Sequence, residues 1–162
     1  MGQRPFVLEF NSLHFEYNKE RVKVFDLKIL KHNGHSALNG TVIFARDIND
    51  FYLDIKALVP KNKRRPWVFL NTTINGCEFL KGINNKRLNI AYIIYNQFKN
   101  FEDFPVKCPV EKDRPIYIPY FYIDSEKSPP YLPVFNFRVT MVSKQKDDYL
   151  YRVSFDIVVK EK

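Results

Sequence analysis

The chain of 162 residues contains very little cysteine, glycine or histidine, with 2 Cys, 5 Gly and 3 His. So few glycines leave little room for the Gly-rich loops whose backbone amides hold phosphates and dinucleotides. We find no recognisable Ser–His–Asp setting and no paired carboxylates that could serve acid–base chemistry. No run approaches the roughly twenty apolar residues that a membrane span needs. These absences argue against an enzyme, a bound cofactor and a membrane-spanning chain.

Aromatic residues and positive charge are plentiful instead. The sequence contains 15 Phe and 10 Tyr, and large aromatic side chains favour half-buried strands. The formal net charge is +8 and the pI is about 9.4. This charge permits attraction to anionic lipid, glycans, nucleic acid or acidic proteins and selects none of them. The length predicts one domain, residues 1–162, that can bury a sizeable core.

Strand-like alternation of apolar and polar residues covers most of the chain. Asn33-Gly34 predicts a tight hairpin turn, and a parity change within residues 22–30 predicts a bulge. The Gly34 turn and a basic loop at residues 60–66 predict a three-stranded meander. Pro119 places its strand at a sheet edge. The predicted strands are residues 6–10 and 13–17 (one broken strand or two), 22–30, 36–45, 51–59, 67–73, 116–123, 135–141 and 149–159.

Eight or nine short strands with regularly spaced turns predict an all-β, antiparallel, immunoglobulin-like β-sandwich or cup. The segment between Cys77 and Cys108 interrupts the pattern. These are the only two cysteines, so we predict a disulfide that closes a loop of about thirty residues and stabilises the fold by roughly 3–4 kcal/mol. Inside the loop, apolar residues recur at spacings of three and four after Asn84 or Asn85. That spacing predicts one helix of about four turns, ending near Asn100.

Two sequons, Asn39-Gly40-Thr41 and Asn71-Thr72-Thr73, accompany the cysteine pair. Together they favour a secreted glycoprotein with sugars at Asn39 and Asn71. The start MGQRPFVLEF has no basic region followed by an apolar stretch, so it is not a signal peptide. Either the printed chain is a mature form with an added Met1, or the chain is not secreted.

Two clusters have both a functional and a structural interpretation. The basic loop at residues 60–66 precedes Trp67, which suggests a nucleic-acid surface with base stacking, or a charged hairpin tip before a core tryptophan. We favour the hairpin tip and predict no nucleic-acid partner. His32 and His35 flank the predicted Asn33-Gly34 turn. Two imidazoles without a third ligand are weak evidence for a metal, so we predict a solvated turn and no metal site.

Several short motifs follow one another in a distinctive order. They are LNGT at residues 38–41, RPW at 65–67, NTTINGCEFL at 71–80, CP at 108–109, and LP at 132–133 before a strand with Arg138. This order resembles the insect DM8 family, which carries the label domain of unknown function 1091 and includes the chemosensory B proteins. The resemblance runs from about Ser36 to the C-terminus, and its distinctive parts are the Cys–Phe–Leu and Cys–Pro elements.

The resemblance implies a secreted insect protein of the MD-2-like lipid-recognition (ML-like) type, similar to the GM2 ganglioside activator. Such proteins are β-sandwiches or cups that take an acyl chain or another apolar ligand between their sheets. Chemosensory B members are implicated in gustatory detection of cuticular hydrocarbon pheromones. The family therefore implies lipid binding and a place in chemosensation and pheromone response.

We hypothesise a secreted, non-enzymatic protein that carries or presents an apolar small molecule, a lipid or a pheromone, between two sheets. The disulfide would hold the predicted helix over the opening. The alternative is a secreted binding module with a filled core, which acts on a receptor or channel ectodomain through the basic loop at residues 61–65. Strand parity and the helix face select the residues expected to line the interior: Leu53, Ile55, Phe69, Ile90, Ile94, Phe137, Val139, Val153 and Phe155.

Overall fold

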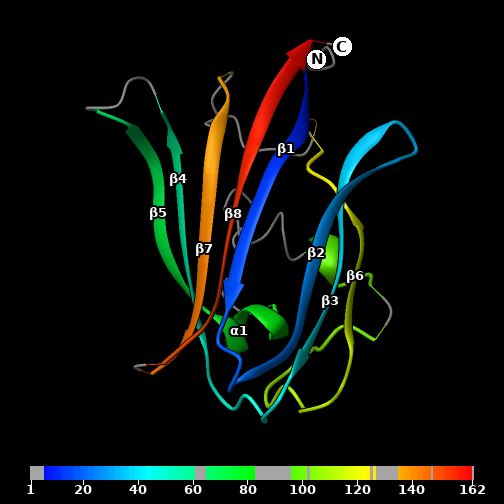
Figure 1. Cartoon of the computed structure of the whole chain (residues 1–162), viewed down its shortest axis with the longest axis vertical. Coiled ribbons are helices and arrows are strands. Elements are labelled where there is room, and N and C mark those ends of the chain that lie inside the picture. Colours follow the sequence, from blue (N-terminus) through cyan, green and yellow to red (C-terminus); the bar gives the residue numbers. More distant parts are fainter. Residues whose placement is uncertain are drawn as a thin grey trace.

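Most of the chain forms two antiparallel β-sheets that face each other (Figure 1). The computed structural model describes residues 6–60, 65–82, 96–101, 103–124, 126, 135–146 and 148–161. One sheet has five strands in the order β1-β8-β7-β4-β5, and the other has three in the order β2-β3-β6. The prediction of an antiparallel β-sandwich is confirmed. The elements are β1 (Phe6–Tyr17), β2 (Val22–His32), β3 (His35–Phe44), β4 (Tyr52–Val59), β5 (Trp67–Asn75), α1 (Gly76–Lys81), β6 (Ile116–Phe121), β7 (Phe137–Gln145) and β8 (Asp148–Glu161).

Several local predictions are confirmed at the residues that carried them. The first strand is one strand, β1, whose pairing with β8 shifts register between Phe10 and Ser12. Asn33 and Gly34 have φ values of 50° and 79°, the positive values that a two-residue hairpin turn of this hand requires. The strand that contains Pro119, β6, lies at a sheet edge, where a residue without an N–H donor is tolerated.

The predicted three-stranded meander is wrong. The hairpins β2–β3 and β4–β5 are present, but β3 belongs to the three-stranded sheet and β4 to the five-stranded sheet. The connection between them carries Ile48, which is buried and exchanges two backbone hydrogen bonds of 2.9 Å with Val110. Because this connection is anchored in the core, the chain crosses between the sheets and does not turn back beside β3.

The chain turns from β5 into a short helix, α1, that we did not predict. Asn75 caps the helix by accepting a hydrogen bond from the Glu78 N–H at 3.1 Å, and Gly82 ends it with a φ of 77°. Gly76 lies so close to Phe51 that a Cβ atom there would overlap the aromatic ring. Of the helix predicted between the cysteines, residues 96–98 are helical, Lys99 and Asn100 already form a turn, and the residues before 96 lie outside the described residues.

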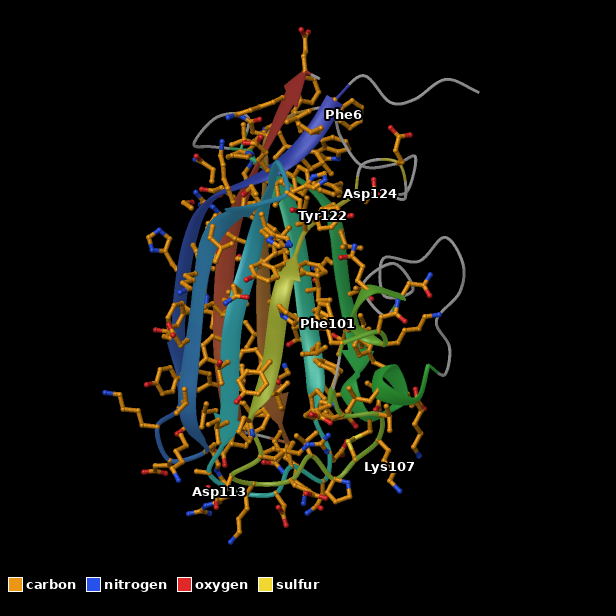
Figure 2. The ribbon with its side chains drawn as sticks, turned by 90° about the vertical axis from the view of Figure 1, so that its right-hand side faces the viewer. Phe6, Phe101, Lys107, Asp113, Tyr122 and Asp124 are labelled. Atoms are coloured by element: carbon orange, nitrogen blue, oxygen red, sulfur yellow. A yellow bond between two sulfur atoms is a disulfide. The ribbon has the colours of Figure 1, made fainter. Side chains whose placement is uncertain are left out.

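The predicted disulfide between Cys77 and Cys108 is confirmed, with a Cα–Cα distance of 5.4 Å. It joins α1 to the segment that leads into β6. Figure 2 shows this link at the end of the molecule near Lys107. The disulfide therefore ties two walls of the sandwich that lie far apart along the chain.

The two long openings between the sheets are closed in different ways. On one side, the Ser36 hydroxyl accepts a hydrogen bond from the Phe10 N–H at 3.0 Å and donates to the Phe10 carbonyl at 3.1 Å, which fastens β1 to β3. On the other side, α1 and residues 96–101 and 103–106 lie between β5 and β6 (Figure 2). Phe98 contacts Phe121 of β6 with ring centroids 5.0 Å apart. Within the described ranges, no helix is long and apolar enough to cross a membrane.

The outer face of the five-stranded sheet is polar. Asp54 of β4 accepts hydrogen bonds from Lys144 and from the Thr73 hydroxyl, each at 2.6 Å. These bonds, the one from Lys144 first, lower the pKa of the Asp54 carboxyl below its ordinary value of 3.8. Farther along the sheet, Arg138 and Asp156 are 2.8 Å apart. A polar outer face and an apolar inner face are expected of an antiparallel sheet with one solvated side.

Candidate functional site

An apolar cavity of about 200 Å³ lies between the two sheets. Both sheets, α1 and the segment after residue 96 contribute to its wall. The cavity is slightly larger than an engineered apolar cavity of about 150 Å³ that binds benzene. The described residues that line it are Phe25, Leu27, Leu38, Val42, Phe44, Phe51, Leu53, Ile55, Ile74, Phe79, Leu80, Phe98, Phe104, Pro105, Val110, Ile116, Ile118, Phe121, Val139, Met141, Tyr151, Val153 and Phe155.

The structure brings together part of the residue set that strand parity selected. Leu53 and Ile55 of β4, Val139 of β7, and Val153 and Phe155 of β8 all line the cavity. These strands are neighbours in the sheet, so their inward-facing residues form one continuous wall.

Phe69 and Phe137 do not line the cavity. Their rings contact each other with centroids 5.4 Å apart and an interplanar angle of 84°. Phe137 belongs to a packed core cluster that contains Ile157, and the partly buried Phe69 packs against this cluster. Strand parity placed them on the inner face, but that face is filled at their position along the strands. Ile90 and Ile94 lie outside the described residues.

The part of the cavity wall that the three-stranded sheet and α1 contribute was not predicted from the sequence. Leu38, Val42 and Phe44 alternate along β3, and Ile116 and Ile118 alternate along β6. The period-two signal for these residues was present in the sequence. The sequence signal for α1 was weaker: Asn75 and Gly82, at its two ends, are residue types that often cap helices.

Tyr151 of β8 is the one described lining residue that carries a hydroxyl. Burial raises the pKa of this phenol above its ordinary value of 10.0, and the nearby Ser143 hydroxyl lowers it by less. The phenol is therefore neutral at physiological pH, and no charged side chain lines the described part of the cavity. An uncompensated charge is costly to bury in such surroundings, so the cavity suits an apolar guest.

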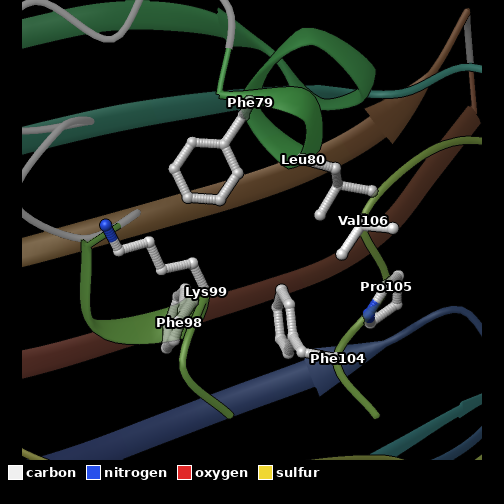
Figure 3. Close-up of a pocket in the computed structure, with 7 residues that line it drawn as sticks. All are labelled: Phe79, Leu80, Phe98, Lys99, Phe104, Pro105 and Val106. Atoms are coloured by element: carbon white, nitrogen blue, oxygen red, sulfur yellow. The ribbon is translucent and has the colours of Figure 1, made fainter. Parts of the chain in front are cut away.

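A small recess of about 30 Å³ lies against the cavity beside α1 (Figure 3). Lys99 and Val106 line the recess but not the cavity. The Val106 residue is 66% exposed. Figure 3 shows the α1 residues of the recess facing those of the later segment. Five wall residues are shared by the recess and the cavity: Phe79, Leu80, Phe98, Phe104 and Pro105.

An aromatic cluster forms much of this shared wall. Phe98 stacks on Phe104 with centroids 5.2 Å apart and an interplanar angle of 21°, and it also contacts Phe101 at 5.3 Å. The cluster continues through Phe121 to Phe10 at 6.3 Å. Aromatic pairs contribute about 0.5–1.5 kcal/mol each beyond their buried area. The segment after residue 96 is therefore held on β6 by specific packing.

The other candidate sites behave as surface features. His32 stacks on Tyr120 with centroids 3.8 Å apart, and His35 stacks on Tyr122 at 4.4 Å. In the part of the chain that the structure describes, no three His, Cys, Asp or Glu side chains group closely enough to hold a metal ion. Residues 61–64 of the basic loop lie outside the described residues, and Trp67 is among the exposed large hydrophobic residues.

A family described as "Protein of unknown function (DUF1091)" matches residues 50–139. The chain belongs to this family. The matched residues contain β4, β5, α1 and β6, both cysteines of the disulfide, and much of the described cavity wall. The resemblance of the cysteine motifs to DUF1091 is confirmed. A search of curated proteins finds no match to this DUF1091 sequence.

Two solved structures are similar in form to this DUF1091 chain. Chicken MD-1, in complex with lipid IVa, is 10% identical, with a TM-score of 0.46, over 99% of this chain and 94% of its own. A Niemann-Pick type C2 protein from Japanese carpenter ant is 16% identical, with a TM-score of 0.36, over 93% and 90% of the two chains. At these values, neither likeness says what the DUF1091 chain binds.

Proposed function

We propose that this protein is a non-enzymatic binding protein that holds an apolar small molecule between its two sheets. The observation that carries the proposal is the cavity of about 200 Å³, whose described wall is apolar except for the Tyr151 hydroxyl. Ligand sites are concave and mostly apolar, with few polar groups that orient the guest.

The size of the cavity restricts the guest. It lies below the range of about 300–1,000 Å³ that is usual for drug-sized ligands, and only slightly above a cavity of about 150 Å³ that holds benzene. A single ring or one short hydrocarbon chain fits completely, and a larger lipid or aromatic probe places one end in the cavity. We therefore expect a lipid with one chain, a fatty-acid derivative or a cuticular hydrocarbon, of which part occupies the cavity.

We further propose that the protein is secreted and that, as in chemosensory B relatives, its ligand is a chemosensory or pheromone compound. The disulfide supports an oxidising compartment. Of the two predicted glycosylation sites, Asn71 is exposed on the edge strand β5. Asn39 is half-buried, and its side chain accepts a 3.4 Å hydrogen bond from the Tyr120 N–H. Intact mass of the secreted protein should show a glycan at Asn71 that Asn71→Gln removes.

The alternative proposal is a surface module with a filled core that acts on a receptor or channel ectodomain. Its basic loop at residues 61–65 lies largely outside the described residues. The cavity favours the carrier, because a filled core would leave no such space. Charge reversal at residues 61–65 distinguishes the two proposals: it abolishes partner binding for the module and leaves affinity for apolar ligands unchanged for the carrier.

Binding of N-phenyl-1-naphthylamine, a neutral fluorescent apolar probe, tests the carrier proposal. We expect saturable binding of one probe per chain and loss of that binding in Val153→Phe, whose ring takes up part of the space that the probe needs. Val158→Phe is the matched control, since Val158 has the opposite parity on the same strand and is not part of the cavity wall. Absence of saturable binding, or equal binding by all three proteins, would contradict the proposal.

A further inference from the structure

The recess beside α1 carries a charge that the cavity lacks. Lys99 is exposed and is the one charged side chain among the described residues that line either space. The recess and the cavity are separated only by the five wall residues that they share. In Figure 3, Lys99 lies on the same side of the recess as Phe98, and Val106 lies opposite. Lys99 thus places a cation beside a cavity whose described wall is apolar except for the Tyr151 hydroxyl.

We propose that the recess binds the anionic head group of a single-chain amphiphile whose tail lies in the cavity, and that Lys99 contacts this head group. The inference rests on the proposed function, because it assumes that the cavity holds the tail. It narrows the ligand from any apolar molecule to one with an acidic end, such as a fatty acid or a related carboxylate.

The sizes of the two spaces match the two ends of such a ligand. A water molecule needs about 10–15 Å³ of accessible space, so the recess of about 30 Å³ holds about two waters or a carboxylate with its two oxygens. The cavity has almost seven times this volume and takes the hydrocarbon. A carboxylate inside the cavity would face only the neutral Tyr151 hydroxyl, and burying it there would be costly. The charged end therefore belongs outside.

The wall between the two spaces is suited to a hydrocarbon. Phe79 and Leu80 are buried on the α1 side, whereas Phe98 and Phe104 are only half-buried. A tail that runs from Lys99 into the cavity passes along these aromatic faces and leaves no polar group unpaired. The exposed Val106 side chain opposite Lys99 gives the first methylene groups an apolar contact.

The net charge of the protein also favours an anionic ligand. The net charge of +8 attracts anions over long distances, and it does so more strongly at low ionic strength. This general attraction acts through many lysines and arginines. A specific role for Lys99 must therefore be separated from the overall charge, and Lys107 provides the control: it is exposed, lies in the same covering segment and lines neither space.

The test compares decanoate with decan-1-ol, which share a chain length and differ in head-group charge. Both displace bound N-phenyl-1-naphthylamine from wild type, Lys99→Gln and Lys107→Gln. We expect Lys99→Gln to weaken decanoate binding about three- to tenfold, the effect of one partly solvated ionic contact, and to leave decan-1-ol unchanged. Lys107→Gln should bind both ligands as wild type does.

Two results would overturn the inference and leave the proposed function intact. One is that decanoate binds Lys99→Gln as tightly as wild type. The other is that Lys107→Gln weakens decanoate binding as much as Lys99→Gln does, which would show general charge attraction only. A third result, no displacement by either ligand and no binding of the probe, would overturn the inference and the carrier proposal together.

Discussion

Val153→Phe tests whether the space between the sheets is open to additional atoms. Val153 lies on β8, is 3% exposed and lines the cavity. The new side chain adds four carbon atoms. At roughly 0.8 kcal/mol for each buried CH₂ group, these atoms stabilise the fold by at most about 3 kcal/mol if they enter free space. In a filled core, the same insertion costs about 1–3 kcal/mol through strained rotamers and backbone shifts. An increase in the free energy of unfolding therefore indicates free space at Val153, and a decrease indicates a filled core.

We expect Val153→Phe to raise the free energy of unfolding by about 1–2 kcal/mol, since imperfect fit removes part of the gain. Urea unfolding of ligand-free protein measures this change, with a constant m value as the check on two-state behaviour. The melting temperature should rise by roughly 2–4 °C for each kcal/mol.

The matched control is the same substitution at Val22. Val22 is 1% exposed, belongs to the packed core cluster at the α1 end and does not line the cavity. We expect Val22→Phe to lower the free energy of unfolding by about 1–3 kcal/mol. If both variants are destabilised equally, the cavity offers no usable space, and the reasoning from its volume is refuted.

Three further perturbations test separate parts of the account. Cys77→Ala removes the link that holds α1, so we expect a loss of about 2–5 kcal/mol of stability in urea unfolding and faster release of the bound probe; an unchanged midpoint would show that the disulfide is irrelevant. The hydrogen bond from Lys144 depresses the folded-state pKa of Asp54 below 3.8, so this carboxylate adds stability that is present above pH 3.8 and lost as the pH falls through the folded pKa. In Asp54→Asn, the free energy of unfolding should therefore fall less steeply as the pH drops below 3.8. The same pH dependence as in wild type would contradict the depressed pKa of Asp54. Gly76→Ala places a methyl group against the Phe51 ring, so we expect about 1–3 kcal/mol of destabilisation and weaker probe binding, because Phe51 lines the cavity; wild-type values for both would contradict this contact.

The alternation of apolar residues was sufficient to predict the strands and the sandwich. It worked because each strand has one buried face, as in β4, where Leu53, Ile55 and Ala57 are buried between exposed or half-buried neighbours. Alternation does not say which sheet a strand joins. The crossing from β3 to β4 depends on burial of Ile48 against Val110, a contact between residues far apart in the sequence. The short helix α1 has too few residues for a periodic pattern to emerge.

The candidate site was predictable only in part, for a similar reason. Parity tells which side of a sheet a residue faces, and it correctly placed Ile55 and Val153 at the cavity. It does not tell where along the strand the interior is filled. Phe69 and Phe137 face inward and fill the space between them by contacting each other. Whether large side chains leave a hollow depends on how both sheets and α1 pack together.

Native mass spectrometry of the intact protein shows directly whether the cavity between the two sheets binds an apolar guest. The purified chain is mixed with decan-1-ol or decanoate, and the bound state is read as a mass shift. The account predicts a complex with one ligand per chain that Val153→Phe abolishes and Val158→Phe retains. A spectrum with free protein only, or with several ligands bound equally to wild type and Val153→Phe, would contradict binding in the cavity between the sheets.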